Sequence, residues 1–322
     1  MIRVVSALFA LLLALPAAAQ SYRTQNYPTR PVRLIVPYQA GQGTDVAARY
    51  FGERLSKALG QQFVVDNKPG AGGNIGTEAV AHAAPDGYTL LMGTNATQTM
   101  NEFLYASTGY DAAKDFAPVV LVGMLPMVIA ANPSVAPSTI PELVAAAKAQ
   151  PDKINVALPS TSARVVFEFF KEKSGAPLFA VPYKGSGTAM TEVMGGQVQL
   201  IVDTATALRG HVQSGKLKAI AITTLKSGEL MPGVKSVAEQ GVPGFEMTPW
   251  TALYAPRGTP KEIVDRLNAE IMKVLAEPES RQKLLSLGFE PAGGTPAELA
   301  AFEKTEREKW GALIKAAGLK GD

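Results

Sequence analysis

Residues 34–45 constrain the fold more than any other stretch, because three structural signals follow one another there. An apolar run ends at Pro37, a loop of small residues contains Gly41 and Gly43, and a periodic helical pattern then covers residues 46–59. Glycine allows a sharp turn and a close approach of a ligand to the backbone. The free N–H groups at a helix start favour an anion. The stretch therefore predicts a strand, a glycine loop and a helix start that together hold a carboxylate.

The alternation of strand and helix patterns continues along the chain and predicts an α/β fold built from βαβ units with a parallel sheet. We predict strands at residues 32–36, 63–66, 88–92, 154–158, 179–181, 200–202 and 217–223. Helices are predicted at residues 46–59, 77–84, 141–150, 160–173, 188–194, 205–214, 260–275, 279–287 and 296–317. In such sheets ligands bind beyond the carboxyl ends of the strands, which places the loops after the first three strands on one rim.

The length of the chain and the position of two longer apolar stretches predict two lobes. A chain of 322 residues exceeds what one hydrophobic core usually serves. The stretches at 116–131 and 245–255 are expected to be strands that cross between the lobes and form a hinge. One lobe then comprises residues 20–124 and 249–322, and the other comprises residues 125–248.

Residues 1–19 have the pattern of a cleaved secretory signal peptide. Arg3 precedes an apolar run at 4–15, and three alanines at 17–19 follow it. The run is shorter than the roughly 20 residues of a membrane span, although an uncleaved anchor is the alternative. The chain has no cysteine, which excludes disulfides, thiolate metal sites and a lipid anchor on cysteine. We therefore expect a soluble protein of the bacterial periplasm.

Composition and motifs argue against several other functions. A net charge of +3 without a Lys/Arg cluster predicts no nucleic-acid binding. The two histidines, His82 and His211, lie in no catalytic motif, and no Gly-x-Ser-x-Gly or metal-ligand spacing occurs. The glycines of residues 67–76 do not match the Gly-x-Gly-x-x-Gly spacing of dinucleotide sites. We therefore expect no enzyme, no metal and no cofactor, although a secreted hydrolase with an Asp or Glu base stays open as an alternative.

Five motifs, at residues 35–45, 67–76, 85–90, 181–185 and 255–260, resemble the tripartite tricarboxylate transporter substrate-binding family, the Bug-type periplasmic receptors. They follow the order and spacing of that family over nearly the whole chain after the signal. The resemblance implies a two-lobed Venus-flytrap fold and a receptor that captures a small organic acid and delivers it to a membrane permease. A monomer is the expected state. A receptor that signals to a sensor kinase is the alternative function.

The resemblance also implies that the loop after the first strand holds a ligand carboxylate, partly through bridging waters. Gln42 departs from the family, because it interrupts the usual run of three glycines. Its side chain is expected either to narrow the loop or to add an amide contact.

The candidate ligand contacts lie in loops at strand ends and helix starts. In the first lobe they are Tyr38, Ala40, Gly41, Gln42, Gly43, Thr44, Asn74, Thr94, Asn95 and Ala96. In the second lobe they are Ser160, Thr161, Ser162, Arg164, Tyr183, Lys184 and Asp203. Hydroxyl groups and helix-start N–H groups suit ligand oxygens, and a guanidinium forms bidentate pairs with carboxylates.

Several of these residues have a structural alternative. Arg164 and Lys184 could be solvated surface residues, and Asp203 could cap the helix that follows it instead of accepting from a ligand amine or hydroxyl. Asp45 is expected to brace the loop, since a second carboxylate would repel an anionic ligand. Trp250 is expected to pack the hinge rather than stack on a ligand.

Overall fold

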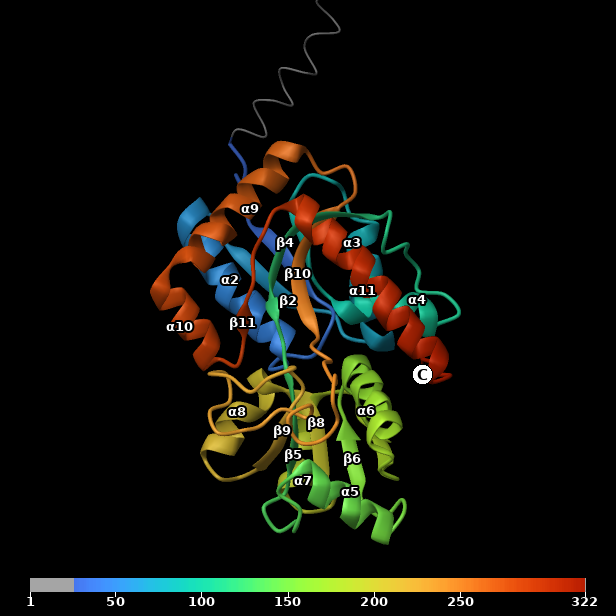
Figure 1. Cartoon of the computed structure of the whole chain (residues 1–322). Coiled ribbons are helices and arrows are strands. Elements are labelled where there is room, and N and C mark those ends of the chain that lie inside the picture. The colour runs from blue at the N-terminus through green and yellow to red at the C-terminus, as the bar shows by residue number, and fades with distance from the viewer. Residues whose placement is uncertain (1–25, 322) are drawn as a thin grey trace, which may run out of the picture.

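The computed structural model describes residues 26–321. They form two mixed β-sheets, and helices cover both faces of each sheet (Figure 1). The predicted signal peptide at 1–19 lies outside the described residues. The first sheet has the strand order β11-β4-β10-β3-β1-β2, and the second has the order β7-β6-β8-β5-β9.

The strands of the first sheet come from both ends of the chain. They are β1 (Val32–Val36), β2 (Phe63–Asn67), β3 (Thr89–Thr94), β4 (Phe116–Met124), β10 (Trp250–Pro256) and β11 (Glu290–Pro291). The prediction of parallel pairing is confirmed for β1 with β2 and with β3. Strand β10, which belongs to one of the two predicted crossings, runs antiparallel to β3 and β4. The physical reason is that β4 leaves this lobe for the other one, whereas β10 returns from it.

The second sheet contains β5 (Met127–Ala131), β6 (Asn155–Leu158), β7 (Phe179–Pro182), β8 (Leu200–Thr204) and β9 (Lys218–Ile222). Strand β6 is parallel to β7 and β8, as predicted. Strand β5 is antiparallel to β8 and β9, because it carries the chain away from the first sheet. The carboxyl ends of β6, β7 and β8 therefore face the first lobe.

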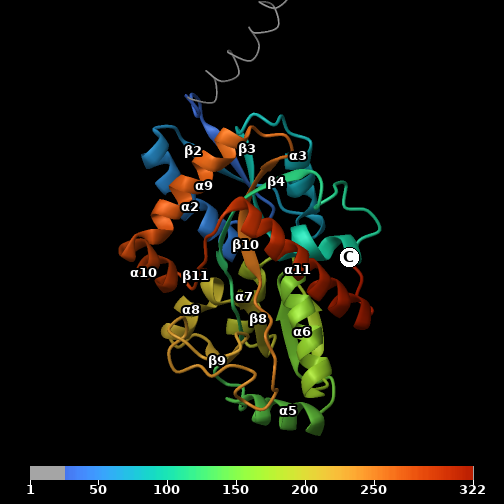
Figure 2. The ribbon, with the colours of Figure 1, turned by 45° about the horizontal axis from the view of Figure 1, so that its top comes forward.

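The helices divide between the two faces of each sheet (Figure 2). On the first sheet, α2 (Gly43–Leu59) and α9 (Lys261–Ala276) pack on one face and α3 (Asn74–Ala81) and α11 (Pro296–Ala316) on the other. On the second sheet, α5 (Ile140–Ala149) and α6 (Thr161–Ser174) cover one face and α7 (Ser186–Met194) and α8 (Ala205–Gln213) the other. Smaller elements of the first lobe are η1 (Ala71–Gly73), η2 (Ala96–Met100), α4 (Asn101–Leu104) and α10 (Pro278–Ser286).

The two crossings between the lobes are shorter strands than the sequence predicted. The expected single strand at 116–131 is two strands, because the chain changes sheets at Leu125 and Pro126. The stretch at 245–255 forms a strand only from Trp250, while Phe245 packs in the core beside α6. The Leu125 N–H donates to the Pro249 carbonyl at 2.7 Å, so the two crossings lie side by side.

A buried carboxylate fastens α11 to the end of β10. Glu306 accepts hydrogen bonds from the indole N–H groups of Trp250, at 3.0 Å, and Trp310, at 2.6 Å. Both tryptophans are fully buried, and Trp250 also packs edge-on against Phe302. Trp250 is therefore a packing residue of the hinge region, as predicted.

Replacement of Glu306 by leucine is expected to lower the free energy of unfolding by about 3 kcal/mol, because it leaves two buried indole donors without an acceptor. Urea denaturation of the ligand-free protein measures the change. Glu308→Leu is the matched control, since Glu308 is exposed on the same helix, and it is expected to leave the unfolding midpoint within experimental error. Equal effects of the two substitutions would contradict the assigned role of Glu306.

Candidate ligand-binding cleft

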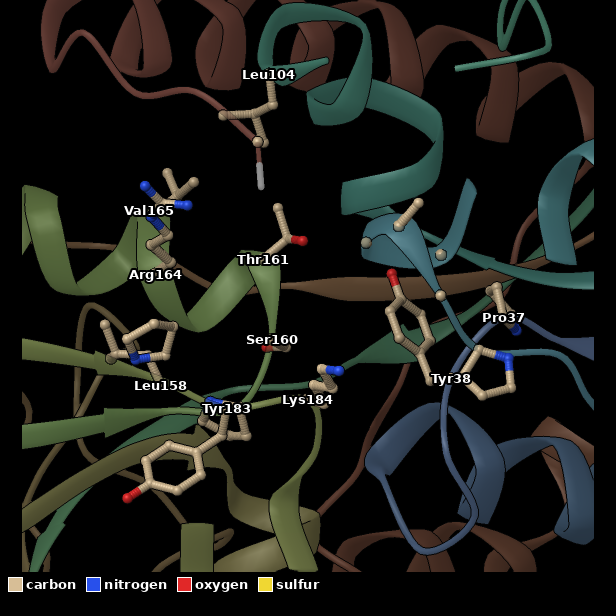
Figure 3. A pocket seen from close by; sticks show the side chains of 18 of the residues that line it. Pro37, Tyr38, Leu104, Leu158, Ser160, Thr161, Arg164, Val165, Tyr183 and Lys184 are labelled. Carbon is tan, nitrogen blue, oxygen red and sulfur yellow. The ribbon is translucent and has the colours of Figure 1, made fainter. Parts of the chain in front are cut away.

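A cavity of about 630 Å³ lies between the two lobes. Its walls come from the loop after β1, the β2–η1 loop and α4 on one side, and from the β6–α6 and β7–α7 loops on the other. The segment after α11 completes the wall. Figure 3 shows Pro37 and Tyr38 facing Thr161 and Arg164 across the open space.

Asp45 braces the loop after β1, which confirms its predicted role. Its carboxylate accepts from the Gly41 N–H at 2.9 Å, from the Asn67 amide at 2.9 Å and from the Arg49 guanidinium at 2.9 Å. Burial favours the neutral acid, but these hydrogen bonds outweigh it and hold the pKa of Asp45 below its usual value. These hydrogen bonds fix the shape of the loop, and the Asp45 carboxylate is occupied within the protein rather than by a ligand.

Gln42 spans the gap between the lobes. Its side-chain N–H donates to the Pro159 carbonyl at 3.4 Å and to the Ser186 hydroxyl at 3.5 Å, both in the second lobe. Its side-chain oxygen accepts from the Gln39 N–H at 3.2 Å. Within the protein, the Gln42 amide therefore joins the first loop to the β6–α6 loop and to the start of α7 in the opposite lobe.

Tyr38 and Thr94 form a polar pair on the first-lobe wall. Their hydroxyl groups lie 2.8 Å apart, and burial raises the pKa of the Tyr38 phenol, so it is neutral at physiological pH. In Figure 3 the Tyr38 ring borders the cavity. The pair offers a hydroxyl donor without adding charge to the cleft.

The start of α6 forms the facing wall. Ser160 caps this helix by accepting from the Ala163 N–H at 3.1 Å, and Ser160, Thr161 and Arg164 all line the cavity. The opposite wall approaches closely at Gly72, where φ is +62° and an added Cβ would lie 2.9 Å from the Thr161 hydroxyl oxygen. The left-handed backbone at Gly72 favours glycine, and an added Cβ would also lie 2.4 Å from the Tyr105 hydroxyl oxygen, so these side chains would have to move.

The β7–α7 loop contributes two predicted residues, Tyr183 and Lys184, whose side chains point in different directions. The Tyr183 hydroxyl donates to the Glu192 carboxylate, and burial together with that bond raises the pKa of Tyr183 to about 12. Figure 3 shows the Tyr183 ring turned away from the cavity, while Lys184 extends toward Tyr38. Lys184 is thus the residue of this loop that presents a charge to the cleft.

A second cavity, of about 40 Å³, lies beside the hinge and has room for about one water molecule. Both lobes line it, and a hydrogen bond of 3.2 Å from the Ser162 hydroxyl to the Asn95 side-chain oxygen crosses between them there. The predicted residues that line it without lining the larger cleft are Gly43, Thr44, Thr94, Asn95, Ser162 and Asp203.

Asp203 is the one carboxyl group among the described residues that line either cavity. One carboxyl oxygen accepts from the Thr204 N–H at 2.7 Å, and the other has no hydrogen-bond partner within residues 26–321. Burial raises the pKa of Asp203 to about 6. The alternative that Asp203 caps α8 is wrong, because the Thr204 hydroxyl performs that role by accepting from the Ala207 N–H.

Four predicted residues line neither cavity. Ala40 and Gly41 are exposed, and Ala96 belongs to a hydrophobic core. The Asn74 side chain accepts from Asn101 at 2.6 Å and from Tyr110 at 3.1 Å, inside the first lobe. The structure therefore places these residues outside both cavities, and their contact with a ligand stays a prediction.

The sequence prediction missed other wall residues. They are Pro37, Gln39, Pro69, Gly70, Ala71, Gly72, Gly73, Leu104, Tyr105, Leu158, Pro159, Val165, Pro182, Leu319, Lys320 and Gly321. The glycine-rich segment was a detectable signal, since it was expected near the cleft. The segment after α11 carries no such sequence signal, because its position depends on how the last helix packs. In the structure, the Gly321 N–H donates to the Leu104 carbonyl at 2.7 Å.

Two features are absent from residues 26–321. These residues contain no group of three or more His, Asp or Glu side chains that could hold a metal ion. They also contain no helix with the length and apolar character needed to cross a membrane.

Comparison with known proteins matches residues 47–319 to the model of the tripartite tricarboxylate transporter family receptor. The protein BugT of Bordetella pertussis is 35% identical over 317 residues, which cover 98% of this chain and 97% of BugT.

Solved structures agree with this match in fold. The structure of R. palustris Rpa4515 with adipate superposes with a TM-score of 0.89 at 34% identity and covers 91% of this chain and 99% of that one. The periplasmic binding protein BugD superposes with a TM-score of 0.85 at 38% identity and the same coverage. The predicted two-lobed α/β periplasmic-binding-protein fold is confirmed. The chain belongs to the tripartite tricarboxylate transporter receptor family.

Proposed function

We propose that this protein is a periplasmic receptor that captures a small organic acid between its lobes and delivers it to a tripartite tricarboxylate-type permease in the membrane. The observation that carries the proposal is the charge of the cleft. Arg164, Lys184 and Lys320 line it, and no Asp or Glu does so among the described residues. Among the described residues of the lining, a carboxylate therefore meets positively charged side chains and neutral polar groups.

The backbone adds to this preference. The start of α6 lies at the cleft, and the start of α2 lies at the adjoining smaller cavity, one helix from each lobe. Helix-start N–H groups carry partial positive charge and stabilise anions. The family relative Rpa4515, whose structure was solved with adipate, supports a carboxylate as the ligand class.

We infer a binding role rather than catalysis. The proteins that this chain resembles are receptors, and neither His82 nor His211 lines the cleft. A ligand that contacts both lobes favours the closed arrangement, because it interacts with the two walls together only when they are close. A permease that recognises the closed form then distinguishes loaded from empty receptor.

An acid panel tests this function. The protein is unfolded and refolded to remove bound ligand, and its melting temperature is measured with malate, citrate, adipate, hexanoate and 3-phenylpropanoate, and with glucose and AMP as non-acid or nucleotide controls. At least one organic acid is expected to raise the melting temperature, since a ligand that binds only the folded state stabilises it. Stabilisation by glucose or AMP but by no acid would refute the proposed ligand class.

Arg164→Ala is expected to weaken binding of the best acid of the panel at least tenfold, because it removes a guanidinium from the cleft wall. Isothermal titration calorimetry measures the dissociation constant. Arg281→Ala is the matched control, since Arg281 is exposed on α10 and lines neither cavity. Unchanged affinity of Arg164→Ala would remove Arg164 from the ligand site.

A further inference from the structure

The segment after α11 has a fixed direction, because a turn at Gly318 ends the helix. Gly318 has a left-handed backbone, with φ +61°. Its N–H donates to the Lys315 carbonyl at 3.2 Å, and the Leu319 N–H donates to the Ile314 carbonyl at 3.2 Å. These two bonds form a Schellman motif, in which a glycine ends a helix and sets the direction of the residues that follow. The position of Leu319 is therefore fixed by the end of the helix.

The other side of this segment is attached to the first lobe beside α4. The Gly321 N–H donates to the Leu104 carbonyl at 2.7 Å. A Cβ added at Gly321 would lie 2.6 Å from the ring of Tyr105, so the backbone lies directly against that ring. In Figures 1 and 2 this end of α11 lies beside α6 of the second lobe. Residues 318–321, which we call the end segment, are thus held on both sides.

The end segment closes one end of the cleft. Leu319, Lys320 and Gly321 all line the cavity, as does Leu104. Figure 3 shows Leu104 at one end of the open space and Lys184 at the opposite end. Because the backbone of Gly321 is bonded to that of Leu104, the end segment lies at the Leu104 end.

The side chain of Leu319 belongs to the wall at this end. It packs against a hydrophobic cluster that contains Leu104, Leu158 and Val165, and all four residues line the cleft. Val165 follows Thr161 by four residues, which is about 6 Å along α6. An acid whose carboxylate is held at the start of α6 therefore needs a body of only a few carbon atoms to reach this end of the cleft.

We infer that Leu319 is a specificity-determining residue that limits the length of the organic acid that the cleft accepts. The inference rests on the proposed function and deepens it, since it names the residue by which acids are sorted. Methylene groups that reach Leu319 leave water and add to binding, whereas a longer acid meets a side chain that the end segment holds in place. Affinity therefore rises with the length of the acid to an optimum and then falls.

Homologous acids test this limit in the refolded protein. Titration calorimetry measures the dissociation constants of the series from butanoate to octanoate, from succinate to suberate and from phenylacetate to 4-phenylbutanoate. In the series that binds most tightly, Leu319→Ala is expected to move the optimum to a longer acid. The next longer homologue is expected to gain at least fivefold in affinity relative to the wild-type optimum. Leu319→Phe is expected to move the optimum to a shorter acid.

Leu313→Ala is the matched control, because Leu313 is also half-buried against the same cluster but lines neither cavity. It is expected to keep the wild-type optimum, and melting temperatures confirm that each variant is folded. An optimum that stays in place in both Leu319 variants, or that moves equally in Leu313→Ala, would overturn the inference and leave the proposed function intact. Binding of malate or citrate but of no series member would do the same. Binding of no organic acid would overturn both.

A second measurement tests whether the ligand covers the side chain at position 319. The chain has no cysteine, so Leu319→Cys introduces a single thiol that iodoacetamide modifies. The tightest acid is expected to slow this modification at least fivefold more than it slows modification of Leu313→Cys, because the side chain at 319 lines the cleft and that at 313 does not. Equal slowing in both variants would assign the protection to closure of the lobes and would contradict the role given to Leu319.

Discussion

The bond from the Leu125 N–H to the Pro249 carbonyl, at 2.7 Å, joins the two segments on which the rest of the molecule depends. One segment leaves the first lobe and the other returns to it. Their opposite directions force β10 to run antiparallel to β3 and β4 and make both sheets mixed. They also bring the carboxyl ends of β1, β2 and β3 opposite those of β6, β7 and β8. Because helix starts follow these strand ends, donors from both lobes converge on one space.

The lobes touch on both sides of that space. Trp310 and Ile314 of α11 share a hydrophobic cluster with Val165 and Val166 of α6. On the other flank, the Thr206 hydroxyl donates to the Gly288 carbonyl at 3.1 Å. The two lobes are therefore in contact on both sides of the cleft. Under the proposed function, opening of the cleft would separate these contacts while the pair of crossings at Leu125 and Pro249 stays together.

Local patterns were enough to predict most strands, most helices and the loops that meet at the cleft. Periodicity and glycine position determine where a strand ends and a helix begins, and these ends are the parts of the fold that build the site. Residues 38, 42, 160, 161 and 164 were predicted in this way and residue 184 from the family resemblance, and the structure places all of them on the cleft wall. Whether they contact a ligand stays a prediction.

Side-chain direction within a loop was beyond the reach of such patterns. Asn74 follows a glycine-rich turn, and the left-handed backbone of Gly73, with φ +97°, directs the chain so that Asn74 points into the lobe toward Asn101. Leu319 and Gly321 reach the cleft only because α11 packs across the first sheet and ends beside α4. Both outcomes depend on tertiary packing, which the sequence of a single segment does not encode.

The chemistry of the cleft suits the proposed role of a receptor that binds and then releases its ligand. A buried carboxylate that forms a close ion pair is costly to separate, because each charge then loses its partner. Here Lys184 and Lys320 are exposed, and most of the remaining polar groups are hydroxyls, amides and backbone N–H groups. Solvent screens the exposed charges once the lobes separate. Under the proposed function, the attraction for an acid is therefore greatest when the two walls are close and falls when they part, which couples closure and ligand affinity through the same residues.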